Sequence, residues 1–542
     1  MQTNIFGEAV QLGLTIEQAA KTANVSSATI RNWIKTGYLI PLSKGVVSQD
    51  SLKAFMSDVA GKEKLTARAN KLMKDAHDHN DVSEKVNSLF QSYTGESIGI
   101  EYENSLSYSY RNKEGIYYTP SWIVKDLFND IEIKASFTFL DPCCGSGNFL
   151  IEAIRQGVAP ENVYGFDIDS NAVAITKQRI RDEFGFAAVN IKVGDFLQEA
   201  HKMSRVDTCF DLIFTNPPWG KKIDKSEKET FSALYGCGNS IDTTSLFFGA
   251  SLSVLKPNGI IGFLTQEAFF NIGAFEHIRK LLISKKIARF VDYGKAFKGL
   301  LTKAQAIIVE KKSATPNDVV KCCAGTNSFY RKLDSFKENP KHIFNFWADE
   351  NQAQVINQIF SIKHTTLKHG ANWALGIVTG NNDKFCSSEP KTGYVPIYKG
   401  SDITKNGLKE PRTFILNNFV GFQQVAPLEL YNAPEKLIYK FISSDLCFYH
   451  DTQQRLILNS ANMLIPKIPN LTAKQLTHLL NSDIINWLFN KLFLTHKVLR
   501  GDLELLPIHF DYFSTHSEFS ETDYLNYLQL TKASDGTYRI KI

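Results

Sequence analysis

A short turn, Asn216-Pro217-Pro218-Trp219, has residue types suited to holding a planar amino group. An NH2 group needs two acceptors for its hydrogens, and the Asn216 side-chain oxygen and the Pro217 carbonyl can supply them. The prolines lack an N–H and fix φ, so the loop is stiff. The Trp219 indole offers a flat face for stacking a base. An ordinary turn after a strand is the alternative interpretation.

A glycine-rich turn lies upstream, at 141–147 (Asp-Pro-Cys-Cys-Gly-Ser-Gly). It follows a predicted strand at 138–140 and precedes a predicted helix that starts near Asn148. Gly145 and Gly147 allow a sharp turn and a close approach of the backbone to a ligand. The spacing fits neither the G-x-G-x-x-G fingerprint nor the P-loop, so it disfavours a phosphate site.

Acidic residues follow two more predicted strands. Asp167 ends one of them, and Asp195 follows the other, with Phe196 directly after it. A carboxylate at such a strand end can accept both hydroxyls of a ribose, and Asp169 is the neighbouring alternative to Asp167. Each acid alone is more simply a solvated turn residue. The prediction therefore depends on the ordered set of segments.

Taken in order, these segments resemble motifs I, II, III and IV of the amino-methyltransferases that use S-adenosylmethionine (SAM). Tyr117-Tyr118-Thr119-Pro120 resembles motif X, and Thr119 is expected to cap the following helix. The motif order resembles the gamma class of N6-adenine DNA methyltransferases of Type II restriction-modification systems. This resemblance implies that SAM is bound by Thr119, Asp141, Gly145, Gly147, Asp167, Asp195 and Phe196, with Asp195 and Phe196 at its adenine.

The same resemblance implies a substrate and a reaction. Asn216, Pro217, Pro218 and Trp219 would hold an adenine flipped out of double-stranded DNA, and Phe297 would close its other side. Phe290 and Tyr293 are rivals for that second aromatic position, and a core role is the alternative for Phe297. The implied reaction is direct in-line methyl transfer, with no metal and no covalent enzyme intermediate.

Other functions stay open at this point. Similar loops hold the amino groups of cytosine N4, RNA guanine and glutamine amides, although cytosine N4 enzymes usually begin the loop with Ser. A DNA-binding regulator with an inactive methyltransferase core is an alternative of another class, and the intact motifs argue against it. Residues 59–110 are too few for a nuclease core, so any restriction endonuclease would be a separately encoded partner.

Both ends of the chain suggest DNA contacts. Residues 14–38 resemble a MerR or excisionase helix-turn-helix followed by a small wing, and a packing module without DNA is the alternative. Its expected DNA-facing side chains are Thr29, Arg31, Asn32 and Lys35. Segments within 374–510 resemble a TaqI-like specificity domain, or are plain loops. Its candidate phosphate contacts are Arg412, Lys436, Lys440, Lys497 and Arg500, any one of which is more simply a solvated surface residue.

The expected fold is α/β, with a SAM-type Rossmann-like core and a mixed α+β target-recognition domain. Core strands are expected near 139, 164, 191, 212, 261 and 290, with a late antiparallel strand at 306–311. The expected domains are a winged helix-turn-helix at 1–58, a helical linker at 59–105, the methyltransferase domain at 106–320 and the target-recognition domain at 340–542.

Composition is that of an intracellular enzyme. The 542 residues carry a formal net charge of +5, which permits nucleic-acid binding without demonstrating it. The eight cysteines have no metal-binding spacing and indicate free thiols in a reducing compartment. There is no signal-peptide pattern and no apolar run of about 18 residues. We therefore expect a cytoplasmic enzyme that acts as a monomer on DNA and has no membrane partner.

Overall fold

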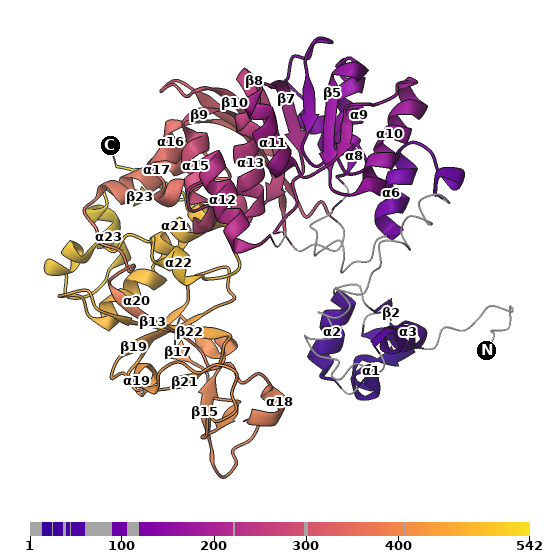
Figure 1. Cartoon of the computed structure of the whole chain (residues 1–542). Helices are drawn as coiled ribbons and strands as arrows, with labels where there is room; N and C mark the ends of the chain where they lie inside the picture. The colour runs from indigo at the N-terminus through magenta and orange to yellow at the C-terminus, as the bar shows by residue number, and fades with distance from the viewer. Residues whose placement is uncertain are drawn as a thin grey trace. The chain divides into compact units, whose positions relative to one another are not determined.

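The computed structural model describes residues 13–23, 25–35, 39–43, 45–59, 89–105, 117, 119–220, 223–297, 302–405 and 407–541. The chain divides into two units, 1–269 with 285–313 and 270–284 with 314–542. Figure 1 shows the chain coloured by residue number. The four domains expected from the sequence were drawn by their expected activities, and their boundaries stay predictions. Most of the predicted linker at 59–105, and Tyr38 and Tyr118, lie outside the described residues.

The first unit contains a twisted sheet whose strands run in the order β9-β10-β8-β7-β4-β5-β6. Strands β8, β7, β4, β5 and β6 are parallel, while β10 pairs antiparallel with both β8 and β9. This arrangement confirms the α/β fold and the late antiparallel strand expected from the sequence. The strands are β4 (Phe139–Asp141), β5 (Val163–Asp167), β6 (Ile191–Val193), β7 (Phe210–Thr215), β8 (Leu255–Gln266), β9 (Lys285–Gly294) and β10 (Ala304–Ser313).

The centre of this sheet is buried on both faces, as a parallel sheet covered by helices requires. Phe139 of β4 and Phe214 of β7 are fully buried, and Phe128 stacks on Phe214 with ring centroids 4.8 Å apart. This packing fixes the carboxyl end of β7, where Asn216 follows. The helices are α6 (Glu96–Ser105), α8 (Ser121–Leu127), α9 (Asn148–Arg155), α10 (Ser170–Phe184), α11 (Phe196–Arg205), α12 (Lys225–Tyr235), α13 (Thr243–Ser253) and α14 (Ala268–Asn271).

The N-terminal residues form a small module with its own core. Trp33 packs against Phe55 with centroids 4.7 Å apart, and Ala19, Ala20 and Ile30 are buried beside them. The helix-turn-helix assignment and its DNA contacts stay predictions. The elements are β1 (Gly13–Thr15), α1 (Ile16–Ala23), α2 (Ser27–Lys35), β2 (Pro41–Ser43), β3 (Val46–Ser48) and α3 (Gln49–Val59), with strand order β1-β3-β2.

The second unit is a mixed α+β assembly with two four-stranded sheets, β13-β22-β19-β20 and β14-β18-β15-β21. Its helices are α15 (Glu276–Ile283), α16 (Asp334–Lys337), α17 (Glu350–Ser361), α18 (Asn382–Phe385), α19 (Leu428–Tyr431), α20 (Ala473–Asn481), α21 (Asp483–Phe493), α22 (Arg500–Leu503) and α23 (Glu521–Tyr527). Its strands are β11 (Val319–Ala324), β12 (Asn327–Lys332), β13 (Ala371–Leu375), β14 (Cys386–Ser387), β15 (Tyr394–Tyr398), β16 (Ile403–Thr404), β17 (Gly407–Leu408), β18 (Phe414–Leu416), β19 (Lys436–Lys440), β20 (Phe448–Asp451), β21 (Leu456–Ile457), β22 (Ala461–Pro466), β23 (Leu530–Lys532) and β24 (Tyr538–Ile540).

One predicted phosphate contact in this unit is wrong. Lys436 is fully buried, and its Nζ lies 2.6 Å from Oδ2 of the equally buried Asp451. A lysine held in such a pair cannot reach a phosphate, so its role is structural. All eight cysteines are free. Among the residues that the structure describes, no helix is both long enough and apolar enough to cross a membrane.

Candidate active site

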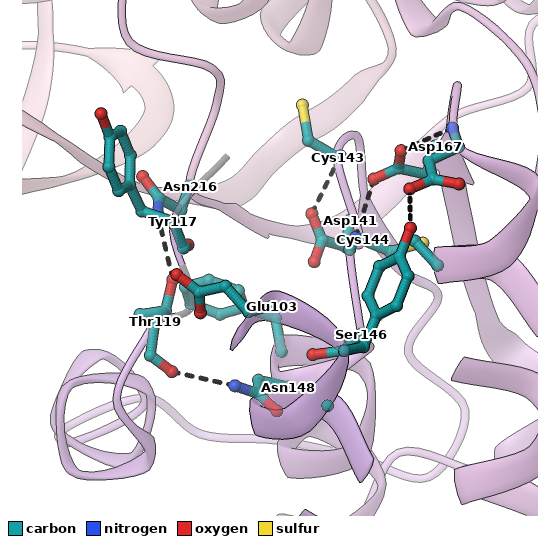
Figure 2. Close-up of a pocket in the computed structure, with 16 residues that line it drawn as sticks. Glu103, Tyr117, Thr119, Asp141, Cys143, Cys144, Ser146, Asn148, Asp167 and Asn216 are labelled. Atoms are coloured by element: carbon teal, nitrogen blue, oxygen red, sulfur yellow. Dashed lines mark hydrogen bonds between the residues drawn. The ribbon is translucent and has the colours of Figure 1, made fainter. Parts of the chain in front are cut away.

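A pocket lies at the carboxyl ends of β4, β5 and β7, where the loops of a parallel sheet gather (Figure 2). Its empty volume is about 630 Å³, which includes open solvent at its mouth. The lining residues are Gly99, Tyr102, Glu103, Tyr117, Thr119, Asp141, Cys143, Cys144, Gly145, Ser146, Asn148, Phe149, Asp167, Asp169, Ala172 and Asn216.

The pocket gathers part of the predicted cofactor set. Thr119, Asp141, Gly145 and Asp167 line it, together with Asn216 of the predicted catalytic loop. Three other predicted cofactor residues do not line this pocket: Gly147, Asp195 and Phe196. Their predicted contacts with SAM, like those of the lining residues, stay predictions.

The glycine-rich turn between β4 and α9 needs glycine at two positions. Gly145 and Gly147 have φ values of +48° and +90°, which residues other than glycine rarely adopt. A Cβ on Gly147 would lie 2.7 Å from Cγ2 of Thr176, so bulk is also excluded there. The Gly145 N–H donates to Oδ2 of Asp167 at 2.9 Å. The turn is therefore fastened to the end of β5.

Asp141 is a buried carboxyl with one oxygen available to a ligand. Its Oδ1 accepts from the Thr215 hydroxyl at 2.7 Å and from the Cys143 N–H at 3.1 Å. Its Oδ2 is buried and has no hydrogen-bond partner among the described residues. Burial raises the pKa of Asp141 to about 7, against the lowering effect of these two hydrogen bonds. A cation beside Oδ2 would satisfy it and favour the ionised form.

The acids at the end of β5 are anchored by turn hydrogen bonds. Asp167 Oδ1 accepts from the Asp169 N–H at 2.9 Å. Asp169 caps α10 by accepting from the Asn171 N–H at 2.9 Å, and its Oδ2 accepts from the Tyr102 hydroxyl. These bonds hold both carboxylates at the pocket wall, where each still has lone pairs for a ligand.

Asp195 and Phe196 begin α11 and have local structural roles. Asp195 caps the helix by accepting from the Leu197 N–H at 2.9 Å. Phe196 is only 1% exposed and packs against Phe166 and Phe247, with centroids 6.1 and 5.9 Å away. The capping bond fixes the direction of the Asp195 carboxylate at the end of β6.

The Asn216 amide is held in one orientation. Its Nδ2 donates to the Tyr117 carbonyl at 3.3 Å and to Thr119 Oγ1 at 3.1 Å. A carbonyl can only accept, so the amide nitrogen and not the oxygen must face Tyr117. Asn216 Oδ1 is buried and lacks a partner in the part of the chain that the structure describes. It is an acceptor prepared for an N–H donor that the chain does not itself provide.

The expectation that Thr119 caps the next helix is wrong. Helix α8 starts at Ser121 and its N-cap is Pro120, with no side-chain cap bond within the described structure. Pro120 has φ −54° and ψ 138°, so the helix begins one residue later than expected. The Thr119 hydroxyl accepts from Asn216 instead, while its carbonyl accepts from Asn148 Nδ2 at 2.9 Å.

Trp219 and Phe297, from separate segments, come together beside the Asn216 loop. Their rings meet edge to face with centroids 5.1 Å apart, and each is 5.9 Å from Tyr117. Two rings that sandwich a base would face it from opposite sides, so Trp219 and Phe297 would have to leave this edge-to-face contact to do so. Phe297 and Trp219 are themselves buried, at 6% and 8% exposure, so the structure does not decide between a core role and a stacking role for Phe297. Of the rivals, Phe290 is fully buried and the Tyr293 hydroxyl donates to Asp126 at 2.6 Å.

Sequence reasoning placed the α6 segment in a helical linker and missed that it supplies Gly99, Tyr102 and Glu103 to the pocket. The signal was weak because no recognised motif covers this segment. The spacing of four between the buried Ile98 and Tyr102 is typical of a helix face and was the one available indication.

Comparisons with known proteins agree with this architecture. The family model for N-6 DNA Methylase matches residues 95–369, and the TaqI-like C-terminal specificity domain matches residues 395–508. The chain is 46% identical over 397 residues to Type II methyltransferase M.VspI of Vibrio sp. (strain 343), covering 73% of this chain and 97% of that protein. It is 25% identical over 208 residues to modification methylase CviBIII of Paramecium bursaria Chlorella virus NC1A, covering 37% and 50%.

A solved structure is also similar. It is that of a nuclease-deletion mutant of the Type ISP restriction-modification enzyme LlaGI in complex with a DNA substrate mimic. The match has a TM-score of 0.49 at 11% identity and covers 90% of this chain and 60% of that chain.

Proposed function

Because this chain belongs to the N-6 DNA methylase family and is a restriction-modification DNA methyltransferase, we propose that it methylates N6 of an adenine flipped out of double-stranded DNA. The observation that carries the proposal is the orphaned, oriented Oδ1 of Asn216 at the pocket. The proposed role is protection of host DNA in the cytoplasm, beside a separately encoded endonuclease, with the enzyme acting as a monomer. The TaqI-like region would hold the recognition sequence.

The pocket residues fit SAM as the methyl donor. SAM carries positive charge on its sulfonium and on its α-ammonium group. Four carboxyl residues line the pocket, Glu103, Asp141, Asp167 and Asp169, and no Lys, Arg or His is among its described lining residues. The buried Asp141 Oδ2 is an acceptor suited to a cationic donor. When bound, SAM would supply a methyl group whose bond to the sulfonium sulfur breaks as the bond to nitrogen forms, so that the sulfur leaves as the neutral thioether of S-adenosylhomocysteine and the amine loses one proton to solvent.

The chain's own residues would orient the amine and stabilise its developing charge. Asn216 Oδ1 and the Pro217 carbonyl each accept a hydrogen bond from one N–H of the amine. Both oxygens therefore face the nitrogen as positive charge develops there. Tyr117 and Thr119 hold the Asn216 amide, which keeps this oxygen in place before the base arrives. Trp219 stacks on the base after it separates from Phe297, and Pro218 keeps the loop stiff.

The test is transfer of labelled methyl from SAM to unmethylated duplex DNA by the full chain. Asn216→Ala should lower transfer by about 10²-fold or more, the usual cost of losing one preorganised polar group, while SAM binding is retained. Asn129→Ala is the matched control, because Asn129 is exposed and its amide bonds only locally to Asp126. Wild-type transfer rates in Asn216→Ala would refute the proposed role.

A further inference from the structure

A chain of hydrogen bonds connects a buried arginine of α10 to the amide of Asn216. It begins at Arg179, whose side chain is buried. Burying a charged group is costly unless hydrogen bonds hold it. The Nη1 of Arg179 donates to Oδ1 of Asn148 at 2.8 Å and also to the carbonyl of Ser146. The guanidinium thereby ties the first residue of α9 to the glycine-rich turn before it.

These contacts fix which way round the Asn148 amide lies. A guanidinium can only donate, so the oxygen of this amide must face Arg179. The amide nitrogen then donates to the carbonyl of Thr119 at 2.9 Å, as Figure 2 shows. A carbonyl can only accept, so both contacts require the same orientation of the amide. The Asn148 side chain therefore links α10 to the segment that precedes α8.

Thr119 carries this link on to Asn216. The carbonyl of Thr119 is held by Asn148, and its hydroxyl accepts from Asn216 Nδ2 at 3.1 Å. The other bond of Asn216 Nδ2 goes to the carbonyl of Tyr117, two residues earlier in the same segment. Both partners of the Asn216 amide nitrogen therefore belong to the segment that Asn148 anchors.

We propose that Asn148, held by Arg179, is a positioning residue for methyl transfer and acts through Thr119. It fixes the segment that binds the Asn216 amide nitrogen, so that the buried Oδ1 of Asn216 stays directed at the substrate amine. The inference rests on the proposed function, because it concerns the orientation of the same amide. The effect of Asn148 should therefore appear in the rate at saturating SAM and not in the affinity for SAM.

Asn148→Asp removes only the donor of this link. The carboxylate still accepts from Arg179, and an acid in the first turn of α9 interacts favourably with the helix dipole, so the Tm should be kept. Its other oxygen now meets the Thr119 carbonyl without a hydrogen between them. Single-turnover methyl transfer by the full chain at saturating SAM should fall by about 5- to 30-fold, as expected for one lost hydrogen bond at a buried group. SAM affinity, measured by calorimetry, should be retained.

A double-mutant cycle separates positioning from a general loss of structure. In the Asn216→Ala background there is no amide to direct, so adding Asn148→Asp should lower the remaining rate no further. Losses that multiply in the double variant would mean that Asn148 acts independently of Asn216, which contradicts the proposal.

Asn162→Asp is the matched control. Asn162 also donates through Nδ2 to a backbone carbonyl, that of Ala135 at 3.0 Å, but it does not line the pocket. This variant should transfer methyl at the wild-type rate. A loss as large as that of Asn148→Asp would show that any such substitution slows the enzyme, and the positioning role would fall.

The remaining outcomes are distinct. An unchanged rate in Asn148→Asp, beside a large loss in Asn216→Ala, would overturn the positioning role and leave the proposed function intact. A weaker affinity for SAM with an unchanged rate at saturating SAM would assign Asn148 to the cofactor and also overturn it. A wild-type rate in Asn216→Ala would refute the proposed function itself.

Discussion

Replacing Thr119 by valine should slow methyl transfer without removing any group expected to touch the adenine. Valine has nearly the shape of threonine and the same β-branching, so the buried site keeps its packing. What is lost is the acceptor 3.1 Å from Asn216 Nδ2, leaving this amide with only the 3.3 Å bond to the Tyr117 carbonyl. The amide can then rotate, and its oxygen is less often directed at the substrate.

The expected size follows from one lost hydrogen bond at a buried donor, about 1–2 kcal/mol. If the loss is felt in the transition state, kcat falls by about 5- to 30-fold. Single-turnover methyl transfer to duplex DNA at saturating SAM measures it. Thr119→Ser keeps the hydroxyl and should stay close to the wild-type rate. Equal rates for Thr119→Val and the wild type, or equal losses in the valine and serine variants, would refute this reasoning.

Three further predictions concern the same pocket. Gly147→Ala should lower the free energy of unfolding by about 1–3 kcal/mol, seen as a lower Tm, because φ is +90° and Thr176 lies 2.7 Å from the new Cβ; an unchanged Tm would contradict this. Burial raises the pKa of Asp141 to about 7, so the carboxyl gains a proton as pH falls from 7 to 5, and SAM affinity should fall by up to about tenfold per unit. Asp141→Asn should bind weakly at every pH; a parallel pH dependence in that variant would exclude Asp141 as the cause. DNA containing a target site should change Trp219 fluorescence as the indole leaves Phe297, and identical changes in Trp219→Phe would contradict this opening.

Much of the fold could be predicted because its signals are local. Strands β4, β5 and β7 are short, largely apolar segments that end at an Asp or Asn turn, and the alternation of such strands with helices predicts the α/β sheet. The glycine-rich turn was also predictable, because Gly145 and Gly147 have positive φ values and glycine is the residue that adopts them most readily.

What could not be predicted depends on contacts between distant segments. The Thr119 hydroxyl could either cap a helix or form a hydrogen bond with Asn216. Which of the two it does depends on where the fold places Asn216, and the sequence around Thr119 does not contain this information. The wall made by α6 depends on how Gly99 approaches Ser146, which no periodicity encodes. Lys436 looked like a surface cation because its buried partner, Asp451, comes from another strand.

Nucleoside analysis of duplex DNA methylated by this chain tests the central claim most directly. Unmethylated DNA is incubated with the full chain and SAM and digested to nucleosides, which are separated and identified by mass. The account predicts N6-methyladenine as the product, absent when Asn216 is alanine. N4-methylcytosine, or unmodified DNA from a folded chain that binds SAM, would contradict it.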